Sequence, residues 1–105
     1  MERTCFTFRL APGVEAEYRR RHDEAWPELL EDLRRAGISN YTLFLQGDQV
    51  IAYAECEPDT RTAFGRMRRS EANQRWAAWF EDLLVDFVDE QGELHYAREI
   101  WHLKE

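Results

Sequence analysis

The chain carries the stretch Glu17-Tyr18-Arg19-Arg20-Arg21-His22-Asp23-Glu24-Ala25-Trp26-Pro27-Glu28-Leu29 near its N-terminus. If this stretch is helical, one face collects residues spaced three or four apart: Val14, Tyr18, His22, Ala25, Leu29 and Leu33. Because most of these side chains are apolar, we expect that face to be buried. His22 lies at its centre, one turn after Tyr18, and therefore needs either a hydrogen-bond partner or a chemical role.

The same stretch predicts where the helix is interrupted. Pro27 has no backbone N–H, and its ring crowds the carbonyl of Asp23, so we expect a break or kink near Pro27. The helical segment Val14 to Ala36 then stops at Gly37, which is a favourable residue for a helix C-terminus.

The remaining pattern alternates between strands and helices. The predicted elements are a strand at Cys5–Leu10, the helical segment Val14–Ala36, strands at Ile38–Gln46 and Gln49–Glu55 around a Gly47-Asp48 turn, a short helix at Pro58–Met67, a helix from Ser70 to Leu84, a polar loop at Val88–Leu94 and a last strand at Tyr96–Leu103. This β-α-β-β-α-β order predicts an α+β, ferredoxin-like protomer that forms one domain over residues 1–105.

Both faces of the predicted sheet carry apolar residues. The helices can cover only one of them, yet Ile38–Gln46 has apolar side chains on both sides. The last strand likewise has Ile100 on one side and Trp101 on the other. An apolar sheet face without helices predicts a homodimer that forms sheet to sheet.

Composition excludes several classes of function. The formal net charge is −7, from 21 acidic and 14 basic residues, which argues against a nucleic-acid partner. The arginines at 19–21 and at 66, 68 and 69 lie among acidic residues, and we interpret them as surface ion pairs. No segment reaches the roughly 18 apolar residues of a membrane span, and no signal peptide is evident. With two cysteines, a reduced, cytoplasmic protein is expected.

His22 is the first candidate for catalysis. The alternative interpretation is a core histidine whose ring is simply hydrogen-bonded. The predicted helix end and the neighbouring Asp23 and Glu24 favour the charged ring, whereas burial favours the neutral ring. A pKa near neutrality would result, which suits general acid–base catalysis.

Three aromatic residues are candidate neighbours of His22. Tyr18 is one helical turn away, and Tyr41 begins a strand that the helices would cover. Trp76 follows Gln74-Arg75 on the last helix and could support the apolar face of a sugar; the alternative for all three is ordinary core packing. No metal site is expected, because His22, His95 and His102 lack ligand spacing, and no cofactor-binding motif is present.

Taken together, these motifs resemble the L-rhamnose mutarotase family. The resemblance rests on Glu17-Tyr18, Arg20-Arg21-His22, Trp26-Pro27-Glu28-Leu29, Gly37, Asn40-Tyr41, Gln74-Arg75-Trp76 and the closing Glu99-Ile100-Trp101-His102-Leu103, and it covers nearly the whole chain. It implies a dimeric α/β barrel of ferredoxin-like protomers without metal or organic cofactor. It also implies an isomerase that interconverts the α and β anomers of L-rhamnose, or of a close 6-deoxy sugar, by ring opening and reclosure.

The resemblance also assigns roles to individual residues. His22 matches the proton donor, and Tyr18, Tyr41 and Trp76 match sugar-contacting positions. The chain departs from some members at Ala77, where a second tryptophan can stand, and Trp79 is a possible substitute. The general base stays open between a tyrosine and a bound water. Two rival interpretations are a cofactor-free monooxygenase or small dehydratase on the same barrel, and a non-catalytic dimeric binding or stress-response module.

Overall fold

A computed structural model describes all residues from Met1 to Glu105. In chain order the elements are β1 (Glu2–Leu10), α1 (Glu15–Asp23), α2 (Pro27–Ala36), β2 (Ile38–Gln46), β3 (Gln49–Cys56), α3 (Thr60–Arg68), α4 (Glu71–Phe80), a 3-10 turn (Glu81–Leu83), β4 (Leu84–Val85) and β5 (His95–Ala97). The strands are antiparallel in the order β2-β3-β1, and β4 and β5 both pair with the free edge of β1. The predicted α+β, ferredoxin-like arrangement is confirmed.

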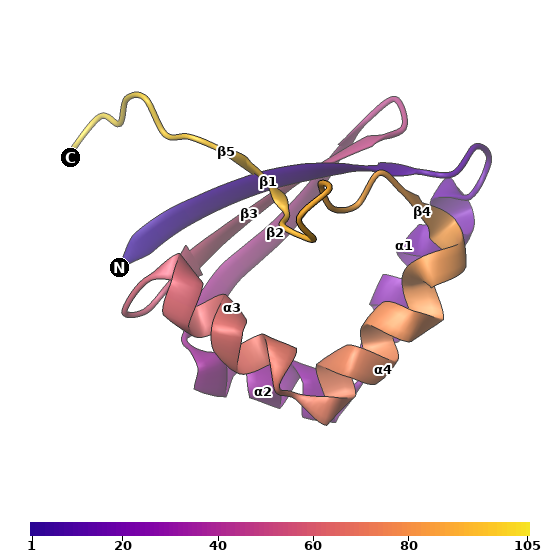
Figure 1. Cartoon of the computed structure of the whole chain (residues 1–105), viewed down its shortest axis with the longest axis horizontal. Coiled ribbons are helices and arrows are strands. Elements are labelled where there is room, and N and C mark those ends of the chain that lie inside the picture. Colours follow the sequence, from indigo (N-terminus) through magenta and orange to yellow (C-terminus); the bar gives the residue numbers. More distant parts are fainter.

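The sheet curls, and its helices lie on one side only (Figure 1). Alternate residues of the central strands point toward those helices and are buried: Phe6, Phe8 and Leu10 of β1, and Val50, Ala52, Ala54 and Cys56 of β3. They form two apolar clusters, one shared with α1 and α4 and the other with α2, α3 and the first turn of α4. The core therefore surrounds the space between the sheet and α4.

The other side of the sheet, called the outer face below, has no helix over it (Figure 1). Its residues are the cross-strand partners Thr7 and Ile51, Cys5 and Tyr53, Phe44 and Ile51, and Thr42 and Tyr53. Phe44 keeps 58% of its surface exposed in the single chain. No helix of the chain has both the length and the apolar character that crossing a bilayer requires.

The predicted interruption of the first helical segment is confirmed. α1 ends at Asp23, and α2 begins at Pro27, where a missing N–H costs no helical hydrogen bond. α2 then ends at Gly37, which has a φ of 96°. A Cβ there would collide with the carbonyl oxygen of Glu57, whose own N–H donates to the Gly37 carbonyl over 2.8 Å. Only glycine fits this position without displacing the end of β3.

The prediction of a last strand at Tyr96–Leu103 is only partly right. β5 covers His95–Ala97, and residues 98–105 pair with no strand of this chain. The edge of β1 is instead shared with β4, which the sequence pattern did not predict. Ile100, Trp101 and Leu103 are 88%, 75% and 71% exposed, so the apolar pattern of this segment has no partner within one chain.

Candidate active site

A cavity of about 390 Å³ lies between the sheet and the helices, within the size range of small-molecule sites. Its lining has 16 residues, of which 14 are hydrophobic: Phe6, Phe8, Tyr18, Ala25, Leu29, Leu30, Leu33, Tyr41, Leu43, Trp76, Ala77, Phe80, Leu84 and Phe87. His22 and Asn73 complete the lining. All four residues that the sequence singled out, His22, Tyr18, Tyr41 and Trp76, therefore border the same cavity.

The ring of His22 is held by its own helix. Its Nδ1 lies 2.9 Å from the carbonyl oxygen of Tyr18, one turn earlier. A carbonyl can only accept a hydrogen bond, so Nδ1 carries the proton and donates it. In the neutral ring, Nε2 then has a free lone pair. The hydrogen bond thus sets the tautomer and leaves the basic nitrogen without a partner in the chain.

Aromatic rings enclose the imidazole. The ring centroid of His22 lies 4.5 Å from that of Tyr18, 4.8 Å from that of Phe80 and 5.4 Å from that of Trp76. Burial among these rings lowers the pKa of His22 below its ordinary value, against the opposing effects of the Tyr18 carbonyl and of Asp23. The neutral imidazole is consequently the main form at neutral pH, and it can accept a proton.

The two phenols have different surroundings but the same protonation state. Tyr18 is buried, and the lack of hydration raises the pKa of its phenol well above the ordinary value. Tyr41 lies in an irregular part of β2, after Asn40 with a φ of 49°. It borders the cavity, and burial of its phenol raises its pKa to about 12. Both phenols are therefore hydrogen-bond donors at neutral pH and poor candidates for a general base.

Trp76 and Trp79 are neighbours on α4, with ring centroids 5.6 Å apart, but only Trp76 borders the cavity. Trp76 borders the cavity and contacts the rings of His22 and Phe80. Both indoles contact Trp26: Trp76 meets it edge-on, with centroids 5.2 Å apart, and Trp79 stacks on it, with centroids 5.5 Å apart and planes 13° apart. Trp79 is absent from the cavity lining. Ala77 does line the cavity. Trp79 therefore does not replace an aromatic side chain at position 77, and the pocket is wider there than a tryptophan would allow.

Arg21 corrects one sequence interpretation. The arginines at 19–21 were interpreted as surface ion pairs, and this holds for Arg20, which pairs with Glu17 and Glu24. Arg21 is buried, however, because it crosses to the end of α4, where it donates to the carbonyl of Trp79 and lies 3.2 Å from Asp82. Its guanidinium also lies over the ring of Trp79. Arg21 thereby joins the C-terminal turn of α1, which carries His22, to α4.

Phe87 and Asn73 are cavity residues that the sequence interpretation did not identify as site candidates. Phe87 belongs to the segment after β4 and stacks edge-on against Phe8, with centroids 5.1 Å apart. Nothing in the local pattern places such a segment over the cavity. Asn73 precedes Trp76 by three residues and shares its helix face. That spacing was available in the sequence and was the signal that could have identified Asn73.

Comparisons with known proteins agree with this geometry. The family model described as L-rhamnose mutarotase matches residues 3–103. The chain belongs to the L-rhamnose mutarotase family. An L-rhamnose mutarotase of Burkholderia orbicola (strain MC0-3) is 39% identical over 89 residues, which cover 85% of this chain and 86% of that protein. One from Jannaschia sp. (strain CCS1) is 31% identical over 103 residues, with coverage of 98% and 99%.

Two solved structures share the fold. The L-rhamnose mutarotase FA22100 from Formosa agariphila superposes with a TM-score of 0.81 at 23% identity, covering 99% of this chain and 100% of that one. Tetracenomycin F2 cyclase from Streptomyces glaucescens superposes with a TM-score of 0.71 at 18% identity, with coverage of 100% and 99%. At these identities the likenesses establish the fold alone, and the family rests on the sequence matches.

We predict that Arg21→Ala destabilises the protein more than Arg20→Ala does. Both arginines pair with Glu17, but only the loss of Arg21 leaves the Trp79 carbonyl without its donor and separates α1 from α4. Thermal unfolding followed by circular dichroism should show a drop of several degrees for Arg21→Ala and little change for Arg20→Ala. Equal melting temperatures for the two variants would contradict the role given to Arg21.

Proposed function

We propose that the protein interconverts the α and β anomers of L-rhamnopyranose by acid–base opening and reclosure of the sugar ring. Membership of the L-rhamnose mutarotase family supports an isomerase acting on a sugar. The observation that carries the residue assignment is the hydrogen bond from Nδ1 of His22 to the Tyr18 carbonyl. It presents an unpartnered, basic Nε2 beside a cavity of monosaccharide size.

The lining of the cavity favours a neutral ligand. Among its 16 residues there is no Asp, Glu, Lys or Arg, so a sugar phosphate or a sugar acid would enter without a countercharge. Apolar rings such as Trp76 and Phe80 suit the C–H faces of a pyranose and the methyl group of a 6-deoxy sugar. L-rhamnose is neutral and carries such a methyl group.

The reaction requires only proton transfers and the breaking of one bond. Nε2 of His22 takes the proton of the anomeric hydroxyl, C1=O forms, and the bond between C1 and the ring oxygen breaks. The imidazolium then gives its proton to the ring oxygen. One nitrogen can serve both oxygens, because the anomeric hydroxyl and the ring oxygen are bonded to the same carbon, C1, in the closed sugar. Rotation about C1–C2 presents the other face of the aldehyde, and the same transfers in reverse close the ring. No proton is gained or lost overall, and no redox step occurs.

In this scheme His22 is both the acceptor of the first proton and the donor of the second. The raised pKa values of Tyr18 and Tyr41 keep both phenols protonated. We propose that they donate hydrogen bonds to sugar oxygens and so orient the ring, while Trp76 supports one face of the sugar. The general base that the sequence left open is then the neutral imidazole and not a tyrosine.

We predict that His22→Ala and His22→Gln slow anomer exchange of L-rhamnose by roughly 10²–10⁴-fold, because both variants lack the proton-transfer group. Saturation-transfer NMR measures the exchange rate above the spontaneous background. His95→Ala is the matched control, since His95 contacts Asp86 and does not border the cavity. A folded His22→Ala protein with wild-type exchange would remove His22 from the mechanism. The same assay with L-fucose, D-galactose and D-ribose identifies the preferred sugar.

The pH dependence of the wild-type enzyme tests which form of His22 is active. Burial lowers the pKa of His22 from 6.5, and in the proposed mechanism the neutral ring is the active form. We therefore expect kcat/KM to stay constant above about pH 7. It should fall as the pH drops through a pKa below 6.5, because the ring then becomes protonated. The phenols should cause no loss below pH 10, because their pKa values are raised. Activity that increases on acidification would show instead that the protonated ring starts the reaction.

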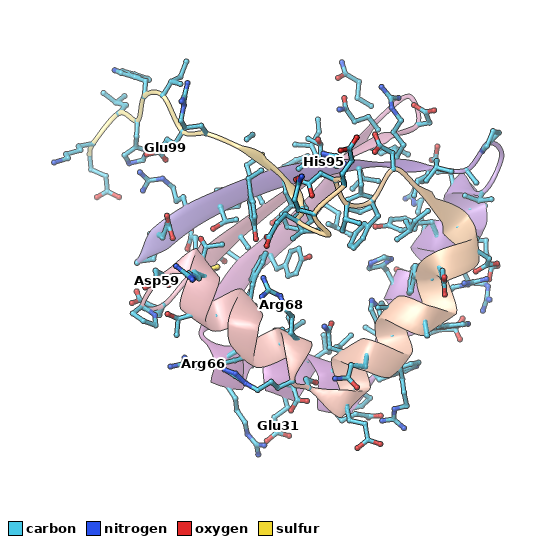
Figure 2. The ribbon with its side chains drawn as sticks, viewed as in Figure 1. Glu31, Asp59, Arg66, Arg68, His95 and Glu99 are labelled. Carbon is cyan, nitrogen blue, oxygen red and sulfur yellow. The ribbon has the colours of Figure 1, made fainter.

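We further propose that two copies associate through the outer face and the C-terminal segment. Phe44 on the outer face and Ile100, Trp101 and Leu103 on the C-terminal segment are large apolar side chains that the single chain leaves exposed. Glu99 holds the start of that segment to Arg3 with a contact of 2.7 Å, on the side away from the helices (Figure 2). Because the two cysteines are free thiols, we also propose that the protein works in the cytoplasm.

We predict a mass of twice 12.6 kDa in sedimentation equilibrium. Phe44→Asp, and separately a chain ending at Glu99, should shift the population toward the monomer, because each change removes apolar surface from the proposed contact. Ala78→Asp is the control, since Ala78 is an exposed apolar residue of α4, far from the outer face. A monomeric wild-type protein, or a dimer that neither change weakens, would contradict this arrangement.

A further inference from the structure

Asn73 is the one polar residue of the cavity to which the proposed chemistry gives no role. The other polar groups of the lining are the His22 imidazole, the two phenols and the Trp76 indole. Asn73 also borders a second cavity of about 330 Å³, which shares Phe6, Leu33, Tyr41 and Phe87 with the first. It therefore lies where the two spaces meet, on a largely apolar wall.

The side chain of Asn73 is held in one orientation. Its Nδ2 donates to the Met67 carbonyl over 3.1 Å, and its backbone N–H donates to Oγ of Ser70 over 3.1 Å. Ser70 in turn donates to Asp32 over 2.6 Å, so the network joins α2, α3 and α4. With Nδ2 committed to a carbonyl, Oδ1 is the remaining group of the amide, and it receives no hydrogen bond from the chain. The structure thus presents a fixed, unused acceptor.

A sugar needs such an acceptor. Each hydroxyl of a monosaccharide donates one hydrogen bond, whereas the protonated phenols and the indole offer mainly donors. Nε2 of His22 is an acceptor, but the anomeric hydroxyl takes it in the proposed reaction. Oδ1 of Asn73 is then the available acceptor for a hydroxyl elsewhere on the ring, and a hydroxyl that binds there avoids being buried unpaired.

The position of Asn73 along α4 indicates which sugar hydroxyl it would bind. Asn73, Trp76 and Phe80 lie along one face of α4, each about one turn from the next. Phe80 and Trp76 contact the ring of His22. Seven residues of α-helix span about 10 Å, so Asn73 lies toward the end of the cavity opposite Phe80. With C1 at Nε2, the hydroxyls that extend furthest in that direction are those at C3 and C4.

We propose that Asn73 is a specificity-determining residue whose Oδ1 accepts a hydrogen bond from the C3 or C4 hydroxyl of the bound sugar. This inference rests on the proposed mutarotase function, because the orientation of the sugar comes from proton transfer at His22. Asn73 is not a proton-transfer group, so its contribution is to binding and to discrimination between sugars.

The test compares Asn73→Ala with Gln74→Ala in the NMR exchange assay. Gln74 is a matched control, because its side-chain amide also donates to a carbonyl of α3, that of Arg68, over 2.9 Å, but it does not border the cavity. We expect Asn73→Ala to lower kcat/KM for L-rhamnose about tenfold, mostly through KM, which corresponds to one lost hydrogen bond. Gln74→Ala should change neither constant more than about twofold.

The wild-type enzyme provides the second measurement. The 3-deoxy or the 4-deoxy analogue of L-rhamnose should exchange with a kcat/KM about tenfold lower than L-rhamnose, and Asn73→Ala should remove that difference. If neither analogue is disfavoured by the wild-type enzyme, or if Asn73→Ala and Gln74→Ala behave alike, the role of Asn73 is overturned while the mutarotase function stands. If the wild-type enzyme exchanges no sugar anomer, the proposed function fails, and the role of Asn73 fails with it.

Discussion

The hydrogen bond from Nδ1 of His22 to the carbonyl of Tyr18 is the interaction on which the site depends. It uses a backbone group of the preceding helical turn, so the ring orientation is set by the helix and needs no second side chain. It also determines the tautomer of the neutral ring, because it places the proton on Nδ1 and leaves the lone pair on Nε2. A side-chain carboxylate at the same position would have held the ring equally well but would have raised its pKa.

That hydrogen bond is useful only if the end of α1 is held at a fixed distance from the sheet and α4. Two features of the chain fix the position of the end of α1. Pro27 makes the chain leave α1 directly after Asp23 and start α2 in a new direction, so Leu29 and Leu33 can line the cavity alongside Tyr18. Arg21, adjacent to His22, joins the same turn to the Trp79 carbonyl at the end of α4. The site is therefore built where two helix ends meet, and its geometry depends on their relative placement.

The parts of this arrangement that could be predicted from the sequence are those with a local cause. The spacing of Tyr18 and His22, the break at Pro27 and the stop at Gly37 follow from helix geometry and backbone chemistry, and the structure agrees with each. Long-range placement could not be predicted in the same way. Arg21 has the same local sequence signal as Arg20, and only the position of α4 makes one buried and the other exposed. Trp79 was a candidate substitute for an aromatic residue at position 77, but it stacks on Trp26 outside the cavity lining.

The strand predicted at Tyr96–Leu103 forms only at its start, for a related physical reason. A pattern of apolar side chains predicts that a segment will be buried. It does not indicate whether the same chain or another chain buries it. Within one protomer the edge of β1 accepts β4 and β5, and the segment beyond Ala97 has no further partner. Its strongly exposed tryptophan and isoleucine retain the pattern of a buried strand. The local signal was thus correct about hydrophobicity and wrong about where in a single chain that hydrophobicity is satisfied.

The same burial that organises the cavity also limits the chemistry it can perform. Enclosing His22 more completely would lower its pKa further and weaken Nε2 as a base, whereas opening it to water would leave it protonated over more of the neutral range. The Tyr18 carbonyl and Asp23 act against burial and keep the reduction of the pKa from being larger. An imidazole in this intermediate state can both accept and return a proton near neutral pH. The mechanism that we propose requires a group that ends each cycle in the protonation state in which it began, and such an imidazole can do so without a charged residue in the cavity.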